Sequence, residues 1–229
     1  MNYPIAETFI SVQGEGYWTG TPMFFIRLAG CNVGEYGASG ATTSEKADFP
    51  LWEQKKHSIC ETISGQRFLC DTDYHKNDVV AAESLVEQAQ EHRVQHVCLT
   101  GGEPFLHDLV PLVTLLGREG IMVHIETSGT KPIKQYGWIT CCPKAGFIAD
   151  DTNMSIIDEY KYLIGPAATL PEIEDFHHKY VKKWQYFYLQ PINGVHDIWR
   201  TNLEKCLTFL QARPDWRLSA QLHKYLEVR

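Results

Sequence analysis

The sequence lacks a hydrophobic run long enough to cross a bilayer, and it lacks an excess of basic residues. No apolar stretch among the 229 residues approaches the roughly 20 residues of a transmembrane helix. Lys and Arg total 21 against 28 Asp and Glu, a formal net charge of −7, which argues against binding to nucleic acid. Residues 1–4 show no basic or apolar part of a secretion signal. We therefore expect a cytoplasmic protein with neither a membrane nor a nucleic acid as partner.

The C-x2-C pairs that are typical of zinc sites are also missing, although the chain has seven cysteines. The count is odd and cytosolic thiols stay reduced, so we expect no disulfide framework. Cys98 and Cys206 lie within apolar runs, as ordinary buried thiols do. Cys31, Cys60 and Cys70 instead lie among glycine, polar and charged residues.

Apolar runs and helical patterns alternate along most of the chain. The runs predict six strands, and the pattern with a period of 3.6 predicts four helices, the first with Asn77 as its N-cap. Such alternation is typical of parallel βα units, so we expect an α/β fold with about six mostly parallel strands in one domain over residues 1–229. An incomplete barrel and an open doubly wound sheet fit equally well. The predicted strands are 23–29, 96–99, 121–126, 138–142, 159–164 and 185–190, and the predicted helices are 78–91, 106–118, 171–180 and 196–212.

Residues 33–69 interrupt this alternation. The segment is polar and rich in Gly, Ser and Thr at first and charged later. A loop of this length is uncommon in a compact domain and usually serves a function or is disordered. We therefore interpret it as a long insert.

Chemically unusual residues follow most of the predicted strands. Ligands bind at the carboxyl ends of strands both in barrels and in open α/β sheets, so these residues predict a ligand site at that edge. They are Cys31, the segments 100–104 and 127–129, Pro143 with Lys144, and Pro191.

Three thiols brought together by a flexible loop can serve more than one purpose. Three thiolates with one open coordination position suit an iron–sulfur cluster, whose free iron then binds another molecule. Zinc is an alternative, although the spacing is wide for it. Three unrelated surface thiols are the other alternative.

Seven short motifs resemble one family. They are GEGYWTGTPMFFIRLAGCN (14–32), CDTDY (70–74), TGGEP (100–104), ETSG (126–129), PK (143–144), LQP (189–191) and QLHK (221–224). TGGEP alone indicates only the radical S-adenosylmethionine (SAM) superfamily. The combination is similar to the 7-carboxy-7-deazaguanine synthases, radical SAM enzymes of queuosine and deazaguanine biosynthesis, over nearly the whole chain except 33–69.

The resemblance implies a modified partial (β/α) barrel and a homodimer that binds a [4Fe–4S] cluster, SAM and Mg²⁺. The implied reaction converts 6-carboxy-5,6,7,8-tetrahydropterin to 7-carboxy-7-deazaguanine with loss of ammonia, through a 5′-deoxyadenosyl radical. A flavodoxin-type electron donor is a further implied partner. The alternatives are another radical SAM enzyme, such as a glycyl-radical activase, and a zinc-stabilised binding module without catalysis.

The cysteine spacing departs from the family pattern. The usual Cys-x3-Cys-x2-Cys motif would place its middle thiol where this chain has Glu35 or Arg67. Cys31 and Cys70 match the motif context, and Cys60 is the nearest remaining thiol, so we assign these three as cluster ligands. The resemblance assigns Thr72 to Mg²⁺.

The resemblance also implies two sets of binding residues and no catalytic group beyond the cofactors. Cys142 stands where the family has Ser. A charge within an apolar strand must be paired or face a cavity, so Arg27 either binds the substrate carboxylate or forms an internal ion pair. The SAM set is Leu69, Asp71, Gly101, Gly102, Glu103, Glu126, Ser128, Cys142, Pro143, Lys144, Gln190, Pro191, Ile192 and Asn193. The pterin set is Val12, Gln13, Gly14, Glu15, Arg27, Thr100, His223 and the C-terminal Arg229.

Overall fold

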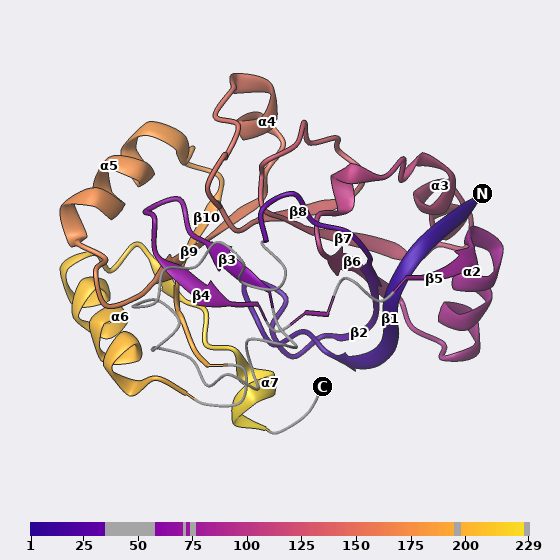
Figure 1. Ribbon diagram of the computed structural model, residues 1–229, viewed down its shortest axis with the longest axis horizontal. Coiled ribbons are helices and arrows are strands. Elements are labelled where there is room, and N and C mark those ends of the chain that lie inside the picture. Colours follow the sequence, from indigo (N-terminus) through magenta and orange to yellow (C-terminus); the bar gives the residue numbers. More distant parts are fainter. Residues whose placement is uncertain (35–57, 71, 74–76, 195–197, 227–229) are drawn as a thin grey trace.

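A nine-stranded sheet forms the centre of the molecule (Figure 1). The structure, a computed structural model, describes residues 1–34, 58–70, 72–73, 77–194 and 198–226. Seven strands run parallel, in the order β11-β10-β9-β8-β7-β6-β2. Their bounds are β2 (Pro22–Leu28), β6 (His96–Gly101), β7 (Met122–Thr127), β8 (Trp138–Cys141), β9 (Glu159–Ile164), β10 (Tyr186–Pro191) and β11 (Arg217–Leu218).

Two antiparallel strands extend the sheet beyond β2. β1 (Asn2–Val12) pairs with β2, and β5 (Asp78–Ala81) pairs with the first residues of β1. Residues 78–81 were expected to begin a helix with Asn77 as its cap, and this prediction is wrong: the helix begins at Ala82, with Ala81 in the N-cap position. The β-branched Val79 and Val80 favour the extended pairing that β1 offers them.

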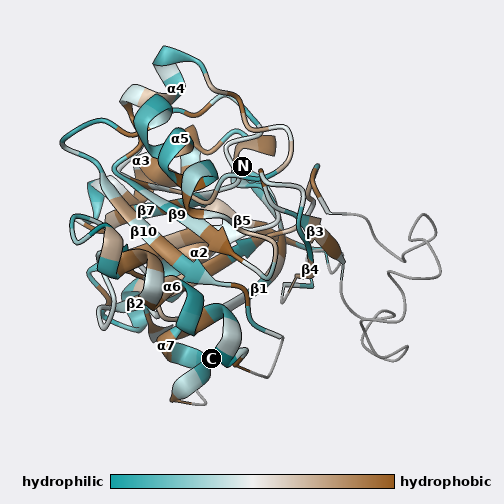
Figure 2. Cartoon of the chain, turned by 90° about the vertical axis from the view of Figure 1, so that its left-hand side faces the viewer, coloured by the Kyte–Doolittle hydropathy of each residue, from teal (hydrophilic) through white to brown (hydrophobic). Residues whose placement is uncertain are grey.

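Helices pack against the sheet. They are α2 (Ala82–Glu91), α3 (Val110–Arg118), α4 (Asp151–Ser155), α5 (Leu170–Tyr180), α6 (Arg200–Ala212) and α7 (Leu222–Tyr225), with a 3₁₀ turn, η3 (Pro104–Leu106). α2, α3 and α5 bury apolar side chains at helical spacing. In α2 the buried residues are Ala82, Leu85, Val86 and Ala89, the spacing of one helix face. Hydrophobic colouring is concentrated on the strands inside the molecule (Figure 2). Within the described ranges, no helix combines the length and apolarity needed to cross a membrane.

The expected α/β class with a mostly parallel sheet is confirmed. The sheet has nine strands where about six were predicted, because β1, β5 and the two-residue β11 were missed. In the described part of the chain, the pairing order begins at β11 and ends at β5 without closing. The sheet is therefore open, and the carboxyl ends of its parallel strands are accessible.

The insert contains regular structure at its carboxyl end. β3 (Ile59–Glu61) and β4 (Arg67–Leu69) form an antiparallel hairpin, where only a loop was expected. The hairpin lies in front of the central strands in Figure 1 and at one side of the molecule in Figure 2. The predicted insert residues 35–57 lie outside the described residues.

Candidate functional site

A cavity of about 230 Å³ lies at the carboxyl ends of six parallel strands, β2 and β6 to β10. The sequence predicted a ligand site at this edge, and most of the predicted site residues line the cavity. They are Val12, Gln13, Gly14, Glu15, Arg27, Cys31, Cys60, Leu69, Cys70, Thr72, Thr100, Gly101, Gly102, Glu126, Ser128, Cys142, Lys144, Gln190, Pro191, Ile192, Asn193 and His223.

Two described residues of the prediction, Pro143 and Glu103, are not among those that line the cavity. Two other predicted residues, Asp71 and Arg229, lie outside the described residues. Glu103 is fully buried. Its carboxylate accepts hydrogen bonds from Thr127 Oγ1 (2.8 Å), the Ser128 backbone N–H (2.9 Å) and the Ser128 hydroxyl. Glu103 therefore fixes the loop after β7, which carries Ser128 into the cavity wall.

The β3–β4 hairpin brings Cys60 and Cys70 to one face. Cys60 is paired with Phe68, and the ladder continues past β4 because the Cys70 N–H donates to the Ser58 carbonyl oxygen at 2.8 Å. Side chains two residues apart on a strand point to the same side. Cys70 therefore shares a face with Phe68 and with its partner Cys60.

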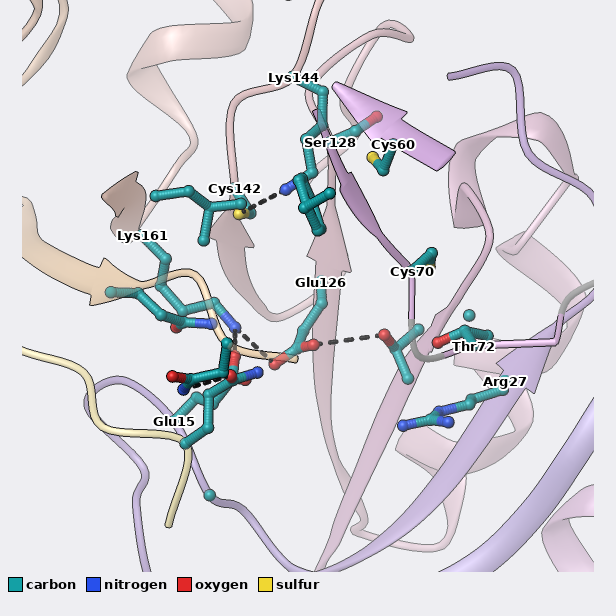
Figure 3. Close-up of a pocket in the computed structure, with 18 of the residues that line it drawn as sticks. Glu15, Arg27, Cys60, Cys70, Thr72, Glu126, Ser128, Cys142, Lys144 and Lys161 are labelled. Carbon is teal, nitrogen blue, oxygen red and sulfur yellow. Dashed lines mark hydrogen bonds and ion pairs between the residues drawn. The ribbon is translucent and has the colours of Figure 1, made fainter. Parts of the chain in front are cut away.

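Lys144 anchors this hairpin to the loop after β8. Thr62 forms a bridge with Lys144, and the Ala145 N–H donates to the Glu61 carbonyl oxygen at 3.1 Å. The buried Lys144 ammonium donates to Cys142 Sγ at 3.0 Å and lies 4.9 Å from the centre of the Phe68 ring (Figure 3). A cation is thus fixed beside the thiols.

The three thiols predicted as cluster ligands line one cavity. In the part of the chain that the structure describes, no three His, Cys, Asp or Glu side chains gather so that they could hold a metal ion. Burial raises the pKa of the Cys60 thiol to about 11, although nearby Lys144 acts in the opposite direction. A metal that binds Cys60 would therefore have to displace the proton of this thiol.

The glycines after β6 pack directly against the segment that carries Cys31. The Gly102 N–H donates to the Leu28 carbonyl oxygen at 3.0 Å. A Cβ atom on Gly102 would lie 1.7 Å from the Gly30 carbonyl oxygen and 3.1 Å from Cys31 Cβ. Gly101 has a φ of +113°, a conformation that glycine adopts readily. Only glycine fits here, and the loop backbone therefore forms the cavity wall beside Cys31.

A buried network of charges forms the opposite wall of the cavity. Lys161 on β9 donates to Glu126 Oε1 at 3.1 Å and to Glu15 Oε2. Gln13 Nε2 donates to Glu126 Oε1 at 3.1 Å, and Gln221 Nε2 donates to Glu15 Oε1 at 2.9 Å. The wall therefore offers carboxylate acceptors that are held in place by neighbouring donors.

Arg27 forms an internal ion pair and also lines the cavity. Its Nη1 lies 2.7 Å from Glu7 Oε1, and Glu7 stands opposite Arg27 in the β1–β2 register. The guanidinium also lies 5.2 Å from the centre of the Phe9 ring. The guanidinium is therefore held at the cavity wall by contacts within the protein.

Segments from the C-terminal part of the chain close the site. The Leu222 N–H donates to the Gly14 carbonyl oxygen at 2.9 Å, and a Cβ atom on Gly14 would lie 2.3 Å from His223 Nδ1. Asn193 Nδ2 donates to Gln221 Oε1 at 3.0 Å. The predicted residues Gly14, Asn193 and His223 therefore lie close together although they are distant in the sequence.

Sequence reasoning missed several residues of the cavity. Lys161 could have been found, because it is a charge within an apolar strand, the same signal that singled out Arg27. Gln221 lies in the QLHK motif that was quoted for the resemblance. Phe25, Thr127 and Lys224 also lie in quoted motifs, and Thr127 belongs to a segment that was expected at the ligand site, but none of the three was assigned a role. The other missed lining residues are Phe9, Val33, Gly34, Phe68 and Leu163, and no signal separated them from core or loop residues.

The chain is similar to curated proteins over its whole length. It is 34% identical to 7-carboxy-7-deazaguanine synthase of Escherichia coli strain K12, with 100% of both chains covered. The same identity relates it to the Synechocystis sp. protein of that name, with 100% of this chain and 95% of the relative covered. The Buchnera aphidicola protein of that name is 32% identical, with 100% of both covered.

A solved structure shares the fold. The crystal structure of QueE from Escherichia coli matches with a TM-score of 0.69 and 30% sequence identity, covering 97% of this chain and 95% of that chain. No protein-family model matches the chain.

Proposed function

The chain belongs to the 7-carboxy-7-deazaguanine synthase family and is an enzyme, and on this premise we propose how its cavity performs the radical SAM conversion of 6-carboxy-5,6,7,8-tetrahydropterin to 7-carboxy-7-deazaguanine with loss of ammonia. The observation that carries the proposal is that Cys31, Cys60 and Cys70 line the same cavity as the Glu15–Lys161–Glu126 network. The same cavity therefore contains thiols that can bind a cluster and carboxylates that can accept hydrogen bonds from a polar substrate.

Cys31, Cys60 and Cys70 hold a [4Fe–4S] cluster in this proposal. Cys31 comes from the end of β2, and the hairpin supplies the other two thiols. The cluster, held by these three thiols, together with SAM would supply the radical chemistry that abstracts a hydrogen atom from the substrate. The protein holds the reactants in place and excludes water.

The strand ends from β6 to β10 hold SAM. The backbone of Gly101 and Gly102 lies beside Cys31 and is close enough to receive the methionyl part of SAM. Ser128, kept in place by Glu103, and Lys144 provide polar contacts. Leu69, Gln190 and Ile192 also line the cavity, and in this proposal they contact the nucleoside of SAM.

The N-terminal segments hold the pterin. Arg27 lines the cavity and binds the substrate carboxylate, for which a planar guanidinium is well shaped. Gln13, Gly14 and Glu15 contact the rings, together with Thr100 and His223. Thr72, which is buried at the cavity wall, provides a hydroxyl oxygen for Mg²⁺, a cation that prefers oxygen ligands.

The partners follow from the family and from the chemistry. The chain acts on a small molecule, and we propose a homodimer that receives electrons from a flavodoxin-type donor in the cytoplasm. A reducing compartment is required because the three ligand thiols must stay free. Another radical SAM reaction, such as glycyl-radical activation, is not favoured, because the relatives carry the deazaguanine synthase name.

An anaerobic assay tests the proposal directly. Protein reconstituted with iron and sulfide is mixed with SAM, Mg²⁺, a reductant and carboxytetrahydropterin, and both methionine and the deazaguanine acid are measured. We expect both products. SAM cleavage without the deazaguanine acid would refute the substrate assignment, and protein that binds zinc but no iron would refute the cluster.

A further inference from the structure

Lys161 is a buried charge for which the site assignment above has no role. It lies at the middle of β9, a strand whose six residues are all buried, and its side chain is 4% exposed. Transfer of a lone ammonium to such a place is strongly unfavourable unless the charge is paired. The groups that pair with the Lys161 ammonium therefore indicate what this buried charge does.

The partners of Lys161 are two carboxylates that line the cavity. Glu15 comes from the loop after β1 and Glu126 from the end of β7, so three separate segments meet at one ammonium (Figure 3). Thr100 Oγ1 donates to Glu126 Oε2 at 3.3 Å, and Gln221 donates to Glu15. The positions of both carboxylates are thus fixed by donors on several sides.

The ammonium also contributes to the charge of Glu15. Burial raises the pKa of Glu15, but the nearby charges of Lys161 and His223 and the hydrogen bonds from Lys161 and Gln221 together outweigh burial and lower it to about 2. Burial lowers the pKa of Lys161, but the attraction of Glu126 and Glu15 outweighs burial and holds it well above its usual value. Glu15 and Lys161 are therefore both charged at neutral pH.

The other ionisable groups around the network do not replace this cation. His223 and Arg27 line the same cavity, and Glu159 lies on β9 itself. The thiols of Cys98 and Cys141 lie on β6 and β8, and Cys142 directly follows β8. Arg27 is bound to Glu7. Without Lys161, Glu15 and Glu126 would be two like charges in a buried wall.

We infer that Lys161 is a positioning residue of the substrate site, which keeps Glu15 and Glu126 fixed as paired acceptors for the N–H groups of a pterin-type ring. The inference rests on the proposed function and adds to it a residue and a recognition chemistry. A pterin presents ring and amino N–H donors beside a carbonyl acceptor. An ammonium has three N–H groups, and the described contacts of Lys161 use two of them. The third N–H is available to the ligand carbonyl.

The test compares Lys161→Met with Lys161→Arg in reconstituted holoenzyme under anaerobic conditions. The equilibrium dissociation constant of carboxytetrahydropterin and its KM are measured from pH 6 to pH 9, with iron content and SAM affinity beside them. For Lys161→Met we expect substrate binding weaker by about tenfold or more, with iron content and SAM affinity unchanged. The loss grows as pH falls, because repulsion raises the pKa of one carboxylate into this range.

The controls separate positioning from packing. Lys161→Arg keeps the charge and should keep a binding constant that varies little with pH. The double variant Lys161→Met with Glu126→Gln removes the like-charge pair and should lose the added pH dependence. The inference would be overturned if both single variants lost the same affinity for carboxytetrahydropterin at every pH. It would also be overturned if Lys161→Met bound the pterin as tightly as the wild type. Wild-type protein that binds the pterin without forming product would refute the proposed reaction and leave the binding comparison intact.

Discussion

Cys60 and Cys70 share one face of the β3–β4 hairpin, because Cys60 stands opposite Phe68, two residues before Cys70. This register explains how, in the proposed assignment, thiols with nine residues between them can serve where the family motif has two residues between its thiols. It also makes the middle ligand testable.

Replacement of Cys60 by Ala should abolish most of the bound iron. Loss of one of three protein ligands leaves the cluster held by two thiols, and SAM-dependent activity should disappear with it. Iron per chain and the visible absorbance after anaerobic reconstitution measure the effect. Cys206→Ala is the matched control, because this thiol is equally buried but lies on α6. Full iron content in Cys60→Ala would show that another group is the third ligand.

Substitution of Gly102 by Ala should destabilise the protein by about 1–3 kcal/mol and weaken SAM binding. The added methyl would meet the Gly30 carbonyl oxygen at 1.7 Å and displace the backbone beside Cys31. Gly117→Ala is the control, because no atom lies within 4 Å of its Cβ position on α3. That control should raise stability by about 0.4–1 kcal/mol. Urea unfolding and SAM titration distinguish the two variants, and similar behaviour of both would contradict the packing argument.

Stability should fall as pH decreases from about 6.5 to about 4, in part because of His124. Burial, with a smaller contribution from neighbouring His96, lowers the pKa of His124 to about 4. In the unfolded chain the pKa is about 6.5, so over this range the unfolded state binds more protons and is favoured. The loss from this group approaches about 3 kcal/mol.

Urea unfolding at pH 7.5, 6 and 5 measures this dependence. His124→Asn should flatten it, whereas His178→Asn, at an exposed position on α5, should leave it as in the wild type. A slope that His124→Asn does not change would assign the acid sensitivity to other groups.

Replacement of Arg27 by Lys should raise the KM for carboxytetrahydropterin by about tenfold. A lysine has no planar pair of N–H donors for a carboxylate, and its ammonium would remain bound to Glu7. SAM binding and iron content should not change. Glu7→Gln frees the guanidinium from its ion pair and should not weaken substrate binding. A large rise in KM for Glu7→Gln, with none for Arg27→Lys, would show that the ion pair itself is the important feature.

The parallel strands could be predicted because their apolar runs are long and separated by clear helical patterns. The antiparallel strands could not, because β1 is partly polar and starts with Asn2, Tyr3 and Pro4, and the four residues of β5 continue directly into α2. Missing β1 had a consequence for the site. Glu7 stands opposite Arg27 in the β1–β2 register, so the internal ion pair had no identifiable partner in the sequence.

The residues of the site could be predicted from sequence motifs. The contacts between these residues could be identified only from the fold. Glu15 and Glu126 were predicted as separate contacts to pterin and SAM. They belong to one network only because β9 places Lys161 between them. The same holds for Cys60. The number of residues between Cys60 and Cys70 does not indicate how the two thiols lie until the register of the hairpin is known.

If Cys60 and Cys70 are cluster ligands as proposed, the hairpin gives this enzyme a ligand motif whose spacing is set by strand register instead of by residue count. Because Cys60 and Cys70 lie on opposite strands, the turn between Glu61 and Arg67 can change in length while both thiols keep their places in the ladder. A search of genomes for fixed cysteine intervals would pass over such chains. Such chains would be found by a search for a short antiparallel hairpin that ends at the CDT motif. In that hairpin, a cysteine is paired with the residue two positions before CDT.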